Sequence, residues 1–204
     1  MIRARWSALW QRLGTTQVPD IEPLLTRLRE PQRHYHTLAH VRHCLATYDH
    51  GPHRDDAVEL ALWMHDAIYD PQAHDNEERS ATWCVELIQH AGISTAISER
   101  ARRCILATRH RHDPTDEAER LTVAVDLTIL GEPPERFRAY DRQIRQEYSW
   151  VPMATYRPER ARVLRGFLAR PMIFPHPWWE RRFGQQARFN LRQAVRRLES
   201  THGR

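Results

Sequence analysis

An adjacent His-Asp pair, His65 and Asp66, stands near the end of an apolar run over residues 60–68. Apolar residues in this run recur at three- and four-residue spacing, which predicts a helix. An ionised carboxylate is rarely buried in such a helix without a partner. A divalent metal ion would be such a partner, since it binds imidazole nitrogens and carboxylate oxygens. The pair fits a metal site, or a helix end that carries no metal.

Three more polar residues stand where the helical pattern would turn them inward. His36 and His40 are four residues apart, so a helix that includes both would present them on one face. Asp126 is the single charge in the apolar run over residues 122–130, where an unpaired carboxylate would be costly. Metal ligation explains these residues. A solvated histidine pair, and a carboxylate bonded to backbone or arginine, are the alternatives.

Taken in order, His40, His65-Asp66 and Asp126 form an H…HD…D pattern. This pattern resembles the HD-domain metal-dependent phosphohydrolase superfamily, over about residues 33–130. More narrowly, the chain is similar to a family of predicted bacterial HD phosphohydrolases. The motifs that carry the narrower likeness are Tyr35-His36-x-x-x-His40, His65-Asp66-x-x-Tyr69-Asp70, Asn76-Glu77-x-x-Ser80, Asp126-Leu127-x-Ile129-Leu130-Gly131 and Arg145-x-Glu147-Tyr148.

The resemblance implies a metal ion held by His40, His65, Asp66 and Asp126. One divalent ion is expected, from among Mn, Fe, Co, Ni, Zn and Mg, and a second ion is the alternative. The ion would acidify a water molecule and polarise a phosphoryl oxygen. By its similarity to the Tyr-His-x-x-x-His arrangement of cyclic-nucleotide phosphodiesterases, His36 would be catalytic and would protonate the leaving oxygen. The alternative is a histidine that supports a ligand or faces solvent.

Asp70 stands where alarmone hydrolases of the superfamily carry the last residue of HDxxED, but Tyr69 replaces the preceding glutamate. Asp70 is therefore a candidate catalytic residue that orients or deprotonates the water, or it begins a loop. Tyr69 is a candidate to contact the substrate or to support the ligands. Asn76 and Glu77 open the next predicted helix, where Glu77 could bind a hydrated second ion or hold His65 in one tautomer. Helix capping explains the same two residues.

The remaining candidates could bind a second ion, a phosphate or a base. His110 follows a predicted helix and is a candidate ligand of a second ion, as in two-metal members of the superfamily, or part of a solvated helix end. Planar guanidinium groups bind phosphate through paired hydrogen bonds, or are simply surface charges. The arginine candidates are Arg33, Arg109 and Arg145. Tyr148 could stack on a base or belong to the core.

Helical periodicity dominates the chain, and no alternating strand pattern of useful length is present. Together with the Gly and Pro positions, it predicts helices over residues 2–13, 20–29, 37–48, 55–68, 77–91, 94–109, 117–130, 133–148, 156–168 and 177–198. The sequence therefore predicts an all-α protein. It is interpreted as a single compact HD-type helical domain over residues 1–204, with its metal-site core at about 33–130 and C-terminal helices over 133–200 packing on that core.

Composition excludes some classes of protein. No apolar run approaches the length of a membrane span, so no association with a membrane is expected. The three cysteines are widely spaced without a CxxC motif, which indicates reduced thiols in a cytoplasmic protein. All 31 basic residues are arginines, and the formal net charge is +5. A basic chain favours an anionic partner, either a small phosphorylated metabolite or a nucleic acid.

Three functions remain in competition. The favoured one is a metal-dependent phosphohydrolase acting on a small phosphorylated substrate, a nucleotide or a related phosphoester. The second is an HD-fold module that binds or processes nucleic acid, which the arginine-rich helix over residues 177–198 suggests. It ranks lower because these arginines spread around most of the helix instead of forming one stripe. The third is a non-catalytic metal-binding scaffold.

Overall fold

The computed structural model describes residues 2–200, which form ten α-helices, one short 3-10 helix (η1) and no strand. The elements are α1 (Ile2–Arg12), α2 (Glu22–Arg27), α3 (Leu38–Asp49), α4 (Asp56–Met64), α5 (Asn76–His90), α6 (Thr95–Ala107), α7 (Glu117–Asp126), η1 (Leu127–Gly131), α8 (Pro134–Glu147), α9 (Met153–Ala169) and α10 (Pro177–Glu199). This confirms the all-α class. Residue 1 and residues 201–204 of the predicted domain lie outside the described part. Within that part, no helix is long and apolar enough to cross a membrane.

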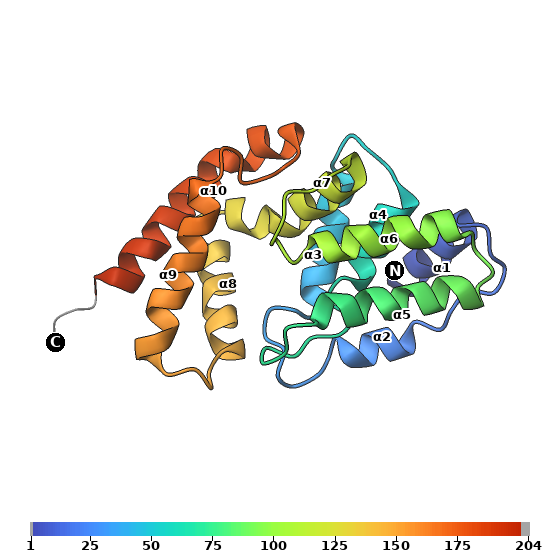
Figure 1. Cartoon of the computed structure of the whole chain (residues 1–204), viewed down its shortest axis with the longest axis horizontal. Coiled ribbons are helices and arrows are strands. Elements are labelled where there is room, and N and C mark those ends of the chain that lie inside the picture. Colours follow the sequence, from blue (N-terminus) through green and yellow to red (C-terminus); the bar gives the residue numbers. More distant parts are fainter. Residues whose placement is uncertain (1, 201–204) are drawn as a thin grey trace.

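Helices α1–α6, here called the early helices, and helices α8–α10, the late helices, gather on different sides of the molecule, and α7 lies between them (Figure 1). α4 packs against α3, α5, α6 and α7, so it lies inside the group of early helices. α9 and α10 pack on each other, and η1 contacts α7, α8 and α10. The segment that begins at Asp126 therefore joins the two groups.

The close approach of η1 to α10 depends on a glycine. A Cβ at Gly131 would lie 2.6 Å from the Cβ of Phe183 and 2.7 Å from its carbonyl oxygen. These distances are shorter than van der Waals contact, so any side chain at position 131 would push α10 away from η1. The glycine that ends the motif beginning at Asp126 thus has a packing role between the two groups of helices.

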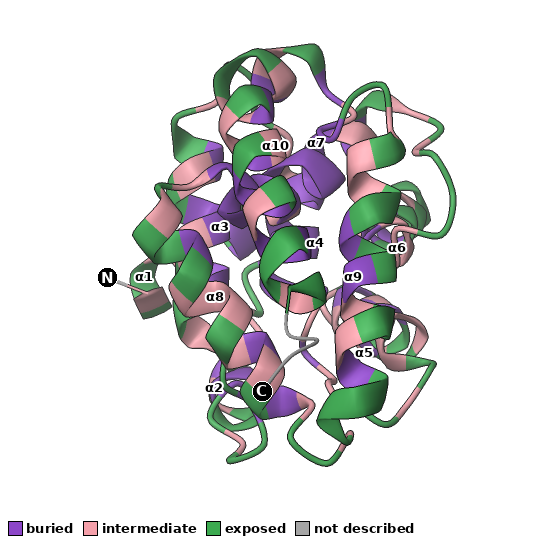
Figure 2. Cartoon of the chain, turned by 90° about the vertical axis from the view of Figure 1, so that its left-hand side faces the viewer, coloured by how far each residue is buried: buried purple, intermediate pink, exposed green. Residues whose placement is uncertain are grey.

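α4 is buried along residues 57–64, and the other early helices surround it. Trp63 of α4 packs edge-to-face on Trp6 with 5.3 Å between ring centroids, and Trp6 packs on Trp10 at 5.4 Å. These contacts hold α1 against α4. Figure 2 shows buried residues in the middle of the molecule and exposed residues on the outward faces of the surrounding helices. The core therefore fixes the position of the helix end that carries the His-Asp pair.

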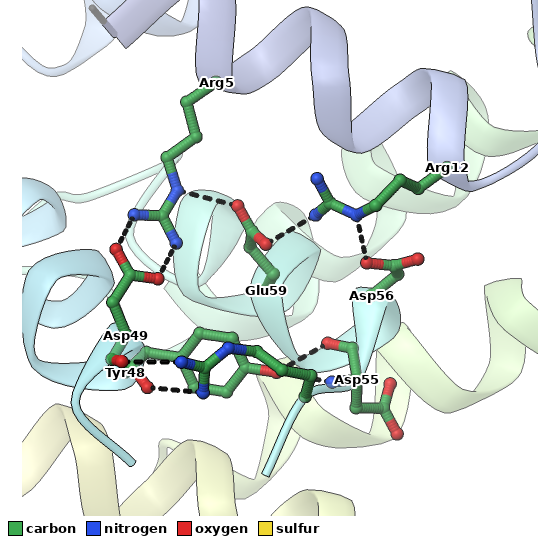
Figure 3. Close-up of a pocket in the computed structure, with 8 residues that line it drawn as sticks. Arg5, Arg12, Tyr48, Asp49, Asp55, Asp56 and Glu59 are labelled. Carbon is green, nitrogen blue, oxygen red and sulfur yellow. Dashed lines mark hydrogen bonds and ion pairs between the residues drawn. The ribbon is translucent and has the colours of Figure 1, made fainter. Parts of the chain in front are cut away.

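An ion-pair network around a buried glutamate also ties α1 to α4 (Figure 3). Glu59 is buried and accepts hydrogen bonds from Arg5 Nε at 2.7 Å and from Arg12 Nη2 at 2.6 Å. Arg5 also pairs with Asp49, and Arg12 pairs with Asp56. Because these five charged groups pair with one another, we interpret the cleft that they line as a structural clamp.

We expect Glu59→Gln to lower the free energy of unfolding by about 1–3 kcal/mol. The amide keeps the shape of the side chain but leaves two guanidinium groups without their buried carboxylate. Urea denaturation measures the change. Glu99→Gln is the matched control, because Glu99 is exposed and its carboxylate forms a loose ion pair with Arg102, at 4.0 Å. Its effect should therefore stay below about 0.5 kcal/mol. Equal losses in the two variants would contradict the clamp.

Two predicted helices end earlier than the hydrophobic pattern indicates. The predicted helix over residues 55–68 ends at Met64, so His65 is its C-terminal cap instead of an interior residue. The predicted helix over residues 117–130 is α-helical only to Asp126 and continues as η1. Both corrections place a candidate ligand at a helix end, from which a side chain can reach a cleft. The other predicted bounds agree with the observed ones within about three residues.

Candidate metal centre

Three of the four candidate metal ligands line a pocket of about 710 Å³, which is within the size range of small-molecule sites. The pocket lies between the early helices and the late ones. His65, Asp66 and Asp126 line it from the ends of α4 and α7, whereas Tyr140 of α8 and Phe167 of α9 line it from the late helices. A bound molecule would therefore contact both groups of helices.

Three helix ends bring the candidate ligands together. Thr37 caps α3 and places His40 in the first turn of that helix. His65 and Asp66 directly follow α4, and Asp126 is the last residue of α7. α3, α4 and α7 pack on one another, so these helix ends converge. Residues that are far apart in the sequence thus meet at one point.

Four ligand atoms lie close to one another in this cluster. His40 Nε2 and His65 Nε2 are 3.0 Å apart. Asp66 Oδ2 lies 3.4 Å from His40 Nε2 and 3.1 Å from His65 Nε2. Asp126 Oδ1 lies 3.2 Å and 3.4 Å from the same two nitrogens. Each carboxylate oxygen therefore lies close to both imidazoles.

Once the imidazoles lose the protons on Nε2, the cluster presents buried acceptors that face one another. The Nδ1 of His65 donates to the carbonyl of Leu62 at 3.2 Å, so Nε2 of the neutral ring is an acceptor. Among residues 2–200, Asp66 Oδ2 is a buried oxygen without a hydrogen bond. Such a set of buried lone pairs suits a cation. One group of residues that lie close enough together to hold a metal ion consists of His40, Cys44, His65 and Asp126.

The charges in the cluster stabilise one another. Burial alone would raise the pKa of Asp66, but the neighbouring His65 outweighs it and holds that pKa well below its usual range. Burial would also raise the pKa of Asp126, but hydrogen bonds from His110 and His40 outweigh this effect and hold the pKa of that carboxyl well below its usual range. Both carboxylates are thus ionised, as metal ligands must be. A metal ion would replace protons on the imidazoles.

A second polar cluster lies beside the ligands. His36 lines the same pocket, and its Nδ1 donates to Glu147 Oε2 at 2.7 Å. Tyr69 stacks on the His36 ring with 4.1 Å between ring centroids, and its hydroxyl donates to the same Glu147 oxygen at 2.9 Å. Since the carboxylate holds Nδ1, the nitrogen of His36 that remains for a substrate is Nε2.

Glu147 gathers five donors on a buried carboxylate. Three of them are the backbone N–H groups of His34, Tyr35 and His36, which bond Oε1 at 2.8, 2.7 and 3.0 Å. Burial would raise the pKa of Glu147, but His36 and the backbone donors lower it to about 2. Burial would lower the pKa of His36, but Asp66 and Glu147 raise it. The pair therefore favours a carboxylate beside a protonated imidazole.

Glu147 should make the stability of the protein sensitive to acid. A carboxyl whose pKa falls from 4.5 to about 2 on folding contributes stability above pH 4.5 and loses it as the pH falls through about 2. The shift corresponds to about 3 kcal/mol. We expect Glu147→Gln to be less stable than wild type at about pH 6, and the difference to shrink as the pH falls from 4.5 toward 2. Urea denaturation at each pH measures this; a constant difference would contradict it.

Two side chains from other parts of the chain explain why α4 ends early. Arg33 is buried and donates to the carbonyls of Asp66 at 2.6 Å and Ala67 at 3.1 Å. Ser80 Oγ accepts the N–H of Ile68 at 3.0 Å. These groups replace the bonds that another helical turn would have made. Arg33 therefore positions the backbone of the His-Asp pair.

The structure does not bring Asp70, the second predicted catalytic residue, to the pocket. Because α4 ends at residue 64, Asp70 no longer shares a helical face with Asp66. Asn76 bonds both the N–H and the carbonyl of Asp70, and the Asp70 carboxylate is exposed and accepts the N–H of Gln72 at 2.9 Å. Asp70 thus begins a loop. Asn76 and Glu77 do line the pocket.

His110 lies beside the ligand cluster. Its Nε2 is 3.2 Å from Asp126 Oδ2, the oxygen that does not face the two other histidines. His110 has a φ of 57°, a left-handed conformation that it alone adopts among the described non-glycine residues. Such strain persists where the surrounding structure imposes it. His110 could orient Asp126, or share that carboxylate with a second ion.

The three arginines predicted to bind phosphate make contacts within the protein. Arg33 holds backbone carbonyls, and Arg145 donates to the carbonyl of Tyr148 and lies over the Tyr156 ring at 4.6 Å. Arg109 pairs with acidic residues at the start of α5. Arg109 and Tyr148 line the pocket, whereas Arg33 and Arg145 do not. The phosphate role predicted for Arg33 and Arg145 therefore has no support in their positions.

Glu147 was absent from the candidate residues predicted from the sequence, although it lies in one of the motifs. Its position carries a signal: it follows Phe137 and Ile144 on the buried face of α8. A carboxylate on an apolar helical face needs a partner, as does Asp126. The partner here is His36, which is 111 residues away in the sequence, so only the fold reveals the pair.

No protein-family model matches the chain, and searches among curated proteins and solved structures found no match either. The fold and the site nevertheless define a class. In residues 2–200, the chain is an all-α protein with a buried His/Cys/His/Asp group that could hold a metal ion.

Proposed function

We propose that this chain is an HD-type metal-dependent phosphohydrolase of a small phosphorylated substrate, such as a nucleotide or a related phosphoester. One observation supports this function above the others: residues of two complementary clusters, the candidate metal ligands and His36, line one pocket. Ligand atoms 3.0–3.4 Å apart suit a divalent ion, and His36 beside them is held by Glu147 as a proton donor would be. Phosphoester hydrolysis needs both an activated water and a proton for the leaving oxygen.

The distance between the two imidazoles, and the distances from them to each carboxylate, suit one ion bound by His40, His65, Asp66 and Asp126. Ligands that bind an ion at about 2.1 Å lie about 3.0 Å apart at neighbouring octahedral positions and about 3.4 Å apart in a tetrahedron. The two nitrogens lie 3.0 Å apart, and their distances to the carboxylate oxygens are 3.1–3.4 Å, so the observed distances cover this range. An ion would bind Asp66 Oδ2, the buried oxygen that has no hydrogen bond.

Cys44 fits the ligand set less well than Asp66. Its sulfur lies 3.7 Å from both ring nitrogens of His40, so it lies on the plane midway between them. An ion on His40 Nε2 would lie about 2 Å beyond that nitrogen, and the sulfur would remain about 3 Å or more away, beyond bonding distance. Burial raises the pKa of the Cys44 thiol well above its usual range, which favours the neutral thiol.

The residues around the ion have separate tasks in the proposed reaction. A bound divalent ion would supply an acidic water molecule and polarise a phosphoryl oxygen. His36 donates a proton from Nε2 to the leaving oxygen, while Glu147 holds its ring through Nδ1 and stabilises the imidazolium form. Tyr69 supports Glu147 through its hydroxyl. The carbonyl of Leu62 keeps His65 in the tautomer that has a free Nε2 lone pair.

A screen for hydrolysis tests the proposed function. Purified wild-type protein is incubated separately with Mn²⁺, Fe²⁺, Co²⁺, Ni²⁺, Zn²⁺ and Mg²⁺, and assayed with nucleotides, cyclic nucleotides, sugar phosphates and bis(p-nitrophenyl) phosphate. We expect hydrolysis that depends on the ion and that is lost in His65→Ala. A protein that binds an ion but hydrolyses none of these esters would contradict the proposal and would favour a non-catalytic metal-binding protein.

A further inference from the structure

Five arginines line the pocket, and they differ in how their charge is balanced. Arg109, Arg160 and Arg162 each form an ion pair with a glutamate or aspartate. Arg111 and Arg170 differ from them: within residues 2–200, no carboxylate lies within ion-pair distance of either guanidinium. Two positive charges in the pocket wall therefore form no ion pair, next to a cluster that could hold a cation.

Contacts with uncharged groups orient one of these two arginines. Arg170 Nη2 donates to the carbonyl of His110 at 3.0 Å, and the guanidinium lies over the ring of Phe167 at 4.7 Å. Burial lowers the pKa of Arg170, and the nearby Asp113 offsets this only in part. Arg170 is thus a half-buried, oriented cation that still has N–H donors to spare.

One residue, His110, links both arginines to the metal cluster. Arg111 directly follows His110, and Arg170 bonds the His110 carbonyl, so both residues lie at the turn that His110 makes and both line the pocket. The imidazole of the same His110 reaches Asp126. His110, which has a left-handed backbone, therefore lies between the two arginines and the ligand cluster.

A glycine leaves room in this part of the pocket. Gly166 lies within α9 and lines the pocket, and a Cβ added there would meet no atom within 4 Å. Glycine inside a helix costs about 1 kcal/mol relative to alanine. The open space lies on the same wall as Phe167 and Arg170, and a bound molecule could occupy it.

We propose that Arg111 and Arg170 form a second anion site, and that the substrate carries a second phosphate group besides the one at the metal cluster. This inference rests on the proposed function, because it places the scissile phosphate at the ligand cluster. Two guanidinium groups can bind a phosphate through several charge-assisted hydrogen bonds. The substrate class is therefore a molecule with two phosphate groups that are joined by a spacer of limited length.

Calorimetric titration with non-hydrolysable probes tests this inference. The probes are inorganic phosphate and a series of alkylene diphosphonates with one to four methylene groups between the phosphonates. The proteins are metal-loaded wild type, the double variant Arg111→Gln/Arg170→Gln, and the control Arg162→Gln, whose exposed arginine lines the same pocket but pairs with Glu159. Metal content and circular dichroism of all three are measured in parallel.

We expect at least one diphosphonate to bind wild type about tenfold or more tightly than phosphate does. The double variant should lose this advantage and keep phosphate binding within about twofold, while Arg162→Gln should retain the advantage. An advantage that survives in the double variant would come from chelation of the ion and would overturn the inference, as would equal binding of all probes, or no binding, by wild type. If wild type held no ion, the proposed function would fall, but phosphate binding lost in the double variant would still support the anion site.

Discussion

Replacement of His36 by alanine is expected to lower kcat by about 10²- to 10⁴-fold for a substrate whose leaving oxygen must be protonated. The loss should be much smaller for a p-nitrophenyl ester, because p-nitrophenolate leaves without a proton. The metal content should not change, since His36 is not among the ligand atoms of the cluster. Steady-state kinetics with an alkyl phosphate ester and its p-nitrophenyl counterpart measure the two effects.

His34→Ala is the matched control for this prediction. His34 is exposed, and only its backbone N–H contacts Glu147, so its side chain can be removed without disturbing the pair. Its kcat should stay within about twofold of wild type on both esters. Equal losses on both esters in His36→Ala would contradict the role of His36 as proton donor and would indicate a structural effect.

Asp126→Ala is expected to remove the bound ion and to lower hydrolysis by at least about 10³-fold, because both water activation and phosphoryl polarisation depend on the ion. The variant should also lose the increase in melting temperature that the ion gives wild type, since a ligand stabilises only the state that binds it. Melting curves with and without a chelator measure this loss beside the rates.

Cys44→Ala distinguishes the two ligand sets at the centre. Cys44 belongs to the group that could hold an ion, but its sulfur is equally far from both nitrogens of His40. If Asp66 completes the set, Cys44→Ala should retain the ion and most of the activity. Loss of the ion in Cys44→Ala, with the ion retained in Asp66→Ala, would contradict the proposed coordination.

The helices and the ligand candidates could be predicted because each leaves a local signal in the sequence. The helical spacing of apolar residues indicates the core faces. His65, Asp66 and Asp126 stand out as polar residues within apolar runs. The packing of α3, α4 and α7 then brings these residues together with His40, as the order of the motifs suggests.

The remaining features depend on contacts between distant segments. The end of α4 cannot be read from its apolar pattern, because the groups that replace the next turn belong to Arg33 and Ser80. The same early end keeps Asp70 out of the pocket. Glu147 acquires its role only when α8 packs against the segment that contains His36. The positions and contacts of these residues depend on tertiary structure, which local sequence patterns do not reveal.

Metal analysis of the purified protein tests the central claim most directly. Elemental mass spectrometry is applied to wild type and to Asp66→Ala prepared in the same way, with circular dichroism to show that both are folded. We predict about one Mn, Fe, Co, Ni or Zn ion per chain in wild type and loss of that ion in the variant. If both proteins were empty, and wild type remained empty after incubation with each ion, the metal centre and the hydrolase built on it would be contradicted.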